Sequence, residues 1–192
     1  MKNITIFLLL LSSLAFAQES LILSIHSYHE SYPWTKEQQT GFRDYIDANA
    51  LSFPLYSTEY LDTKRGKFDK EYEDEIARYF TVKYKGYEPD VIYVTDDNAL
   101  KFTLNHKEEI FPNSPIVFSG VNDKKLITSL DKNTYVGIEE KKDFLSNIKL
   151  IKELFPQEQQ LLIFGDGSTT AEAIHKSIGD DLTKLSDIEL KY

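Results

Sequence analysis

Short apolar runs alternate with segments of helical periodicity along this sequence. The apolar runs have the length of strands, and the segments between them place apolar side chains at i, i+3 and i+4. Strands are therefore expected at 21–25, 53–61, 90–95, 115–118, 134–138 and 160–164, with a further one at 188–192. Helices are expected at 35–50, 68–84, 99–111, 123–130, 142–155 and 170–185. This alternation predicts an α/β fold with parallel sheets flanked by helices, because each crossover is long enough for a right-handed βαβ unit.

The apolar run at 4–14 has a different context from the others. It follows Lys2 and precedes Ala15-Phe16-Ala17, which fits an A-x-A cleavage site. We interpret residues 1–17 as a secretory signal peptide, because an apolar core of this length is too short to cross about 30 Å of hydrocarbon. An uncleaved N-terminal anchor is the alternative. The mature protein would begin near Gln18 and be periplasmic or otherwise extracytoplasmic.

The order of the elements divides the rest of the chain into two parts. Residues 18–138 contain five expected strands, enough for a complete small α/β lobe. Residues 139–192 begin a second series of the same kind, and this series ends on a strand. A sheet that ends this way keeps an unpaired edge. We therefore expect a truncated second lobe and a longer, two-lobed parent protein.

Composition and charge exclude several classes of protein. The chain is 41% hydrophobic and 28% charged, which is ordinary for a globular protein. A net charge of −9 without basic clusters argues against nucleic-acid binding. The absence of Cys excludes disulfides and thiolate metal sites. We expect no metal and no cofactor.

The loop after the first expected strand is the strongest candidate for a binding site. Tyr28, Tyr32 and Trp34 offer flat faces for stacking on a small molecule or a cation, and His26 could hydrogen-bond or titrate. In open α/β sheets ligands bind beyond the carboxyl ends of the strands, where this loop lies. The alternative is that Tyr32 and Trp34 pack the first helix onto the sheet.

Two later loops follow strands in the same way. Asp96 and Asp97 follow the third expected strand, and one of them should cap the next helix while the other is free to bind a ligand. Ser119, Gly120 and Asn122 follow the fourth strand, where a small residue and a glycine permit close approach of a ligand to the backbone. A tight strand–helix turn explains the same residues.

The second lobe and the passage to it supply the remaining candidates. Glu139 lies at the expected hinge, and Asp166 and Ser168 follow the sixth strand. No catalytic residue is proposed, because the four His residues lie on separate elements and no hydrolase or zinc-protease motif occurs. The GDGS sequence at 165–168 lacks the Lys of a phosphate-binding loop.

Several segments together resemble a known family. They are HSYHESYPWT at 26–35, TDDNAL at 95–100, FPNSPIVFSGVN at 111–122, and the segment from VGIEE at 136 to GDGSTT ending at 170. The sequence resembles the substrate-binding proteins of ABC transporters, and within them the extracytoplasmic sensor domains that precede histidine kinase or diguanylate cyclase modules. The resemblance implies a type I periplasmic-binding-protein fold, in which two α/β lobes close on a small ligand.

Three functions follow as expectations. The first is a sensor domain that binds a small molecule, either amino-acid-like or a cationic aromatic compound. The second is a free solute-binding protein of an ABC importer, and the third is a secreted hydrolase that uses the acids of the cleft. Membrane contact is expected only through a missing downstream segment or a permease partner.

Overall fold

The structure is a computed structural model that describes residues 20–50, 54–158, 160–182 and 189–191. The expected signal peptide at 1–17 lies outside the described residues. None of the helices in the described part of the chain has the length and hydropathy needed to cross a membrane.

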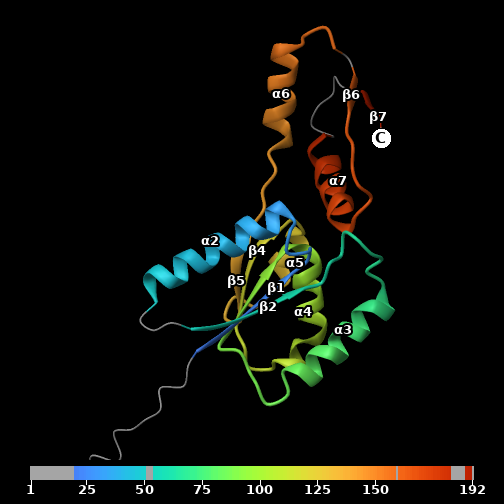
Figure 1. Cartoon of the computed structure of the whole chain (residues 1–192). Helices are drawn as coiled ribbons and strands as arrows, with labels where there is room; N and C mark the ends of the chain where they lie inside the picture. Colours follow the sequence, from blue (N-terminus) through green and yellow to red (C-terminus); the bar gives the residue numbers. More distant parts are fainter. Residues whose placement is uncertain (1–19, 51–53, 159, 183–188, 192) are drawn as a thin grey trace, which may run out of the picture.

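The first lobe alternates strands and helices in the expected order (Figure 1). Its elements are β1 (Leu21–His26), α2 (Pro33–Asn49), β2 (Leu55–Tyr60), α3 (Lys70–Lys83), β3 (Val91–Thr95), α4 (Asp96–Ile110), β4 (Ile116–Val121), α5 (Lys124–Ser129) and β5 (Tyr135–Glu139). The strands form one sheet in the order β2-β1-β3-β4-β5, and every neighbouring pair is parallel. The prediction of an α/β fold with parallel strands is confirmed.

The strand order changes direction between β1 and β3. Chain connections leave these two neighbouring strands toward opposite sides of the sheet, which opens a crevice beyond their carboxyl ends. The loop after β1 and the start of α4 border this crevice. The topology therefore brings residues 27–32 and 96–97 together, although more than 60 positions separate them in the sequence.

The central strands are buried, as their apolar sequences require. Leu23 and Ile25 of β1 and Val94 of β3 are fully inaccessible to solvent. Helices α3 and α4 supply Phe80 and Phe102 to the same core, where their rings pack edge to face with centroids 5.4 Å apart. This core fixes the positions from which the loops of the crevice extend.

A smaller second unit follows β5. It contains α6 (Phe144–Leu154), β6 (Gln160–Leu162), α7 (Thr169–Leu182) and β7 (Glu189–Lys191), and β6 pairs with β7 in parallel. Among the described residues its buried apolar side chains are Ile148 and Ile178. Figure 1 shows α7 above the first lobe, with its N-terminal end pointing toward it.

The prediction that Asp96 or Asp97 caps α4 is wrong. The helix begins at Asp96, three residues earlier than predicted, so both aspartates lie in its first turn and not before it. The hydroxyl of Ser27 accepts the hydrogen bond of the Ala99 backbone N–H at 2.8 Å and donates to Thr95 O at 2.8 Å. The cap comes from the loop after β1, which leaves the carboxylates of Asp96 and Asp97 for other partners.

Candidate functional site

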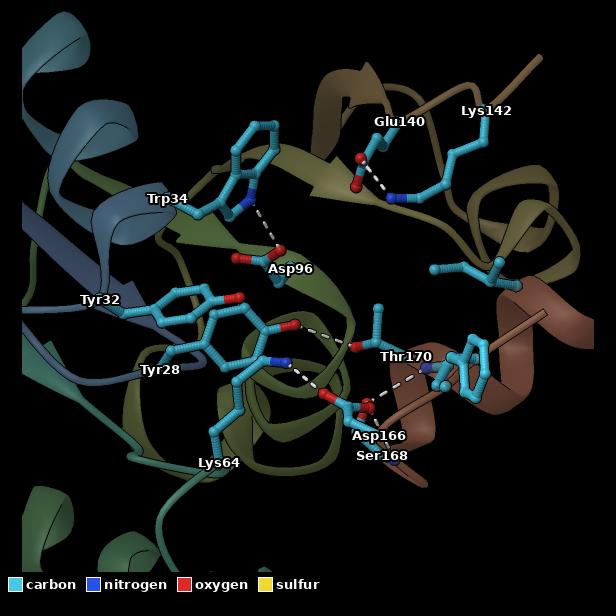
Figure 2. Close-up of a pocket in the computed structure, with 14 residues that line it drawn as sticks. Tyr28, Tyr32, Trp34, Lys64, Asp96, Glu140, Lys142, Asp166, Ser168 and Thr170 are labelled. Carbon is cyan, nitrogen blue, oxygen red and sulfur yellow. Dashed lines mark hydrogen bonds and ion pairs between the residues drawn. The ribbon is translucent and has the colours of Figure 1, made fainter. Parts of the chain in front are cut away.

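A pocket of about 490 Å³ lies between the two units, beyond the carboxyl ends of the first-lobe strands (Figure 2). Its wall combines aromatic rings with acids and lysines from loops far apart in the sequence. The lining residues are Tyr28, Tyr32, Trp34, Lys64, Asp96, Glu140, Lys142, Phe164, Gly165, Asp166, Ser168, Thr170, Ala171 and Ile174. The volume suits a small organic molecule.

Asp96 has an unusual backbone conformation, with φ of +67°. Residues other than glycine rarely adopt this left-handed conformation, and Asp is among those that tolerate it. Its carboxylate accepts hydrogen bonds from Trp34 Nε1 at 3.1 Å and Gln38 Nε2 at 3.2 Å. Burial raises the pKa of Asp96 to about 7, although these hydrogen bonds lower it, and the charges of Asp97 and Glu140 raise it further. A buried acid on strained backbone is typical of functional sites.

Hydrogen bonds behind the pocket fix the orientation of Gln38. Ser119 Oγ donates to Gln38 Oε1 at 2.5 Å, and the Tyr93 hydroxyl lies 2.7 Å from Ser119 Oγ. Since Oε1 is occupied as an acceptor, the amide nitrogen of Gln38 faces Asp96. Gly120 has φ of +71°, and a Cβ there would lie 3.1 Å from Gln38 Oε1 and 3.3 Å from Asp96 Oδ1. Ser119 and Gly120 thus support the acid from outside the pocket.

Two tyrosines of the loop after β1 surround a lysine. The rings of Tyr28 and Tyr32 pack edge to face with centroids 5.0 Å apart. Lys64 Nζ lies 4.9 Å from the centroid of Tyr28 and 5.3 Å from that of Tyr32, within range of cation–π attraction. Burial, together with the charge of Asp96, raises the pKa of Tyr28, so its hydroxyl stays neutral. That hydroxyl lies 3.0 Å from Thr170 Oγ1 in the second unit.

Asp166 brings the second unit into the same cluster. Lys64 Nζ donates to Asp166 Oδ2 at 2.7 Å, while Oδ1 accepts from the backbone N of Ser168 at 3.0 Å and from its hydroxyl at 2.5 Å. The hydrogen bond from Lys64, followed by those from Ser168, holds the pKa of Asp166 well below its usual range. Ser168 Oγ also accepts from Ala171 N at 3.2 Å and thereby caps α7.

A second ion pair lies where the chain passes from one unit to the other. Lys142 Nζ donates to Glu140 Oε1 at 2.7 Å, and Glu140 Oε2 accepts from Asn122 Nδ2 at 3.2 Å. Figure 2 shows this pair across the pocket from Tyr28 and Tyr32. The passage between the units is therefore tied to the loop after β4.

The predicted site residues that line the pocket come from the segments that follow β1, β3 and β6, including the first turns of α2 and α4. They are Tyr28, Tyr32, Trp34, Asp96, Asp166 and Ser168. The other predicted residues lie outside its wall: His26, Asp97, Ser119, Gly120, Asn122 and Glu139.

His26 belongs to the interior of the lobe. Its side chain stacks on Tyr60, with ring centroids 5.3 Å apart, and is fully buried. Nε2 lies 2.9 Å from Gln39 Oε1, an acceptor, so Nε2–H donates there and Nδ1 accepts from the Thr95 hydroxyl at 2.9 Å. Burial lowers the pKa of His26 to about 4, although the hydrogen bond to Gln39 raises it. His26 is therefore a neutral side chain with both nitrogens occupied.

Asp97 connects two segments of the scaffold. Its carboxylate accepts from Asn122 N at 3.1 Å, Asn122 Nδ2 at 3.2 Å and Asp123 N at 3.0 Å. Asp97 and Asn122 thus hold the loop after β4 against α4. Glu139 is the last residue of β5 and is exposed, as are the three residues before it. Glu140, one position later, lines the pocket instead.

The sequence interpretation missed several residues of the wall. They are Lys64, Glu140, Lys142, Phe164, Thr170, Ala171 and Ile174. Lys64 could have been found, because it follows a strand of a parallel sheet as the recognised loops do. Ile174 could not, because nothing in a helical period tells which apolar side chain faces a pocket.

The pocket is equipped to bind and orient a molecule. The described residues hold no group of three or more His, Asp or Glu side chains arranged for a metal ion. Two acids of the pocket, Asp166 and Glu140, are hydrogen-bonded to lysines, and aromatic faces lie beside them. Such walls recognise charge and shape.

No protein-family profile and no curated protein matches this chain. Its fold is similar to that of a solved structure described as the ligand-free, open structure of CD0873, a substrate binding protein with adhesive properties from Clostridium difficile. The TM-score is 0.58 at 13% identity, and the match covers 90% of this chain and 56% of the other. The chain thus spans little more than half the length of that protein. At this identity the likeness shows a shared fold alone.

Proposed function

We propose that this chain is part of an extracytoplasmic domain that binds a small molecule between two α/β lobes. The single observation that carries the proposal is a pocket whose wall combines residues from both units at the carboxyl ends of the strands. On this account residues 18–138 are the first lobe, residues 139–192 begin the second, and residues 1–17 direct export. The likeness in fold to a substrate-binding protein supports the same function.

The proposed ligand carries a positive charge next to an apolar or aromatic group. Lys64 and Lys142 are each paired with an acid of the pocket, Asp166 and Glu140. Among the described residues this leaves Asp96 as the acid of the pocket without a cationic partner. A ligand ammonium bound at Asp96 would lie beside the indole of Trp34. An amino-acid-like compound and a cationic aromatic compound both carry such a group.

We further propose that ligand binding serves signalling. In this proposal closure of the lobes shifts a two-state equilibrium that a membrane-bound histidine kinase or diguanylate cyclase module reads. The resemblance of the segments at 26–35 and 111–122 to sensor domains supports this use. Delivery of the ligand to an ABC permease is the alternative. The coding sequence beyond codon 192 distinguishes them: a membrane span and output module favours the sensor, and an early stop beside permease genes favours the importer.

A thermal-shift screen tests the binding function. The protein is heated with amino acids, amines, purines and small carboxylates in turn. A ligand at about 100 times its Kd should raise the melting temperature by about 5–10 °C. The shift should disappear in Trp34→Ala and persist in Tyr45→Ala, a control on the exposed face of α2. A well-folded protein without any shift, or a shift that survives Trp34→Ala, contradicts the proposal.

A further inference from the structure

The ion pair between Lys64 and Asp166 joins the two units inside the pocket (Figure 2). Its members come from the loops after β2 and β6, and Nζ lies 2.7 Å from Oδ2. The side chain of Lys64 is 21% exposed and that of Asp166 is 53% exposed. The ammonium is therefore the enclosed partner, and the carboxylate is the partner open to exchange.

Lys64 has reasons to stay in place that do not involve Asp166. Its ammonium faces the rings of Tyr28 and Tyr32 at 4.9 and 5.3 Å, and these rings belong to the first lobe, as Lys64 does. Cation–π attraction of this kind persists whichever acid is bound. The first lobe thus presents a fixed cation to the pocket.

Asp166 binds Lys64 with one oxygen and its own loop with the other. Oδ1 accepts from the backbone and hydroxyl of Ser168, at the start of α7, whereas Oδ2 reaches across to Lys64. Loss of the bond to Lys64 leaves the turn at Ser168 intact. The positive end of the α7 dipole continues to stabilise the freed carboxylate.

We propose that Lys64 binds a carboxylate of the ligand, and that this carboxylate exchanges with Asp166 at the Lys64 ammonium. The inference rests on the proposed function and narrows it. A ligand whose carboxylate binds Lys64 and whose ammonium binds Asp96 carries both charges. Of the two proposed ligand classes, this favours the amino-acid-like compound over the purely cationic one. The exchange also replaces the direct contact between Lys64 and Asp166, which joins the two units, with a contact between Lys64 and the ligand. Ligand binding therefore alters how the lobes meet.

Phenylacetate and its neutral counterpart phenylacetamide test the exchange, with fluorescence of Trp34, the chain's sole Trp, as the readout. Phenylacetate should bind the wild type, lose at least about tenfold in affinity in Lys64→Met and keep it in Lys64→Arg. Asp166→Asn should strengthen phenylacetate binding about threefold, because the competing charge is gone while the amide oxygen still accepts from Ser168. The affinity for phenylacetamide should be the same in the wild type and in the Lys64 and Asp166 variants. Lys67→Met, on an exposed lysine outside the pocket, is the control.

Four results would overturn the exchange. The first is weaker phenylacetate binding in Asp166→Asn, since Asp166 would then belong to the ligand site. The second is a loss in Lys142→Met with none in Lys64→Met, since the other lysine would then hold the acid. The third is no phenylacetate binding by a wild type that binds phenethylamine, which refutes the exchange and spares the proposed function. The fourth is no binding of phenylacetate, phenylacetamide or phenethylamine, which refutes the exchange and, if the thermal-shift screen also gives no hit, the proposed function.

Discussion

Asp96 carries a cost that an ordinary acid does not. Its carboxylate is buried, its backbone is left-handed, and two neutral donors, Trp34 Nε1 and Gln38 Nε2, are its hydrogen-bond partners. Burial opposes ionisation and the left-handed backbone costs stability, and the two neutral donors offset the lost hydration of the carboxylate only in part. Costs of this kind are common among residues of functional sites.

Asp96→Asn should stabilise the protein at high pH. The pKa of Asp96 is raised from 3.8 to about 7 on folding, so the folded state holds a proton between these values that the unfolded state has released. Stability therefore falls as pH rises from about 4 to 7, by on the order of 4 kcal/mol in total. Asn keeps the left-handed backbone and removes the titration. Urea unfolding should show a gain at pH 8 and none at pH 4; an equal gain at both would contradict the assignment.

His26→Gln should change the pH dependence of stability in the direction opposite to that of Asp96→Asn. The pKa of His26 falls from 6.5 to about 4 on folding, so the unfolded state binds the extra proton between these values. The wild type therefore loses on the order of 3 kcal/mol as pH falls from about 6.5 to 4. The variant should lose less over that range, whatever its stability at pH 8. Urea unfolding at several pH values measures the slope, and an unchanged slope would show that His26 does not titrate as inferred.

At the scale of single residues, the sequence indicates which side chains lie near the pocket better than it indicates their hydrogen-bond partners. Tyr28, Trp34 and Asp96 were recognisable because polar and aromatic side chains directly follow strands. The interior role of His26 was not, because its partners Gln39 and Thr95 are set by packing across different elements.

At the scale of elements, close packing between neighbouring strands fixes the frame of the site. Gly137 in β5 lies against Phe118 in β4, so near that a Cβ would overlap the backbone oxygen and ring of Phe118. The lack of a side chain at Gly137 is needed for this close contact and not for the backbone conformation, because the backbone of Gly137 is not left-handed. The loops that carry Glu140 and Asn122 leave the ends of these two strands.

Gly137→Ala should therefore destabilise the protein by about 3 kcal/mol, because the added carbon forces β4 and β5 apart. Thermal unfolding measures the loss. Gly41→Ala is the matched control, since a Cβ at this helical position meets no neighbouring atom and alanine favours the helix. Equal stability of Gly137→Ala and the wild type would contradict the close contact.

The order of elements could be predicted because strand and helix periods differ clearly in this chain. The described strands and helices follow the expected order. The start of α4 was misplaced because Ser27 caps it from another element, 72 positions away from Ala99. Local sequence cannot report such a cap.

On the scale of the whole molecule, the two units differ in how much of their apolar surface they bury. The first lobe has a continuous core around Leu23, Ile25 and Phe102. In the second unit Leu154 and Phe164 are 63% and 88% exposed. Phe164 lines the pocket, so part of this exposed surface faces the place where a ligand would bind. The sequence predicts where apolar segments lie in this part of the chain, but not which of their faces remain uncovered.

The central claim is that the pocket between the units binds a cation at Asp96. Titration with phenethylamine, followed by the fluorescence of Trp34, tests it most directly, with 2-phenylethanol as the neutral control. We predict saturable binding at pH 8, about tenfold weaker affinity for each pH unit below 7 as Asp96 gains its proton, and a loss in Asp96→Asn. No saturable change at pH 8, or binding that Asp96→Asn and pH leave unaltered, would contradict the claim.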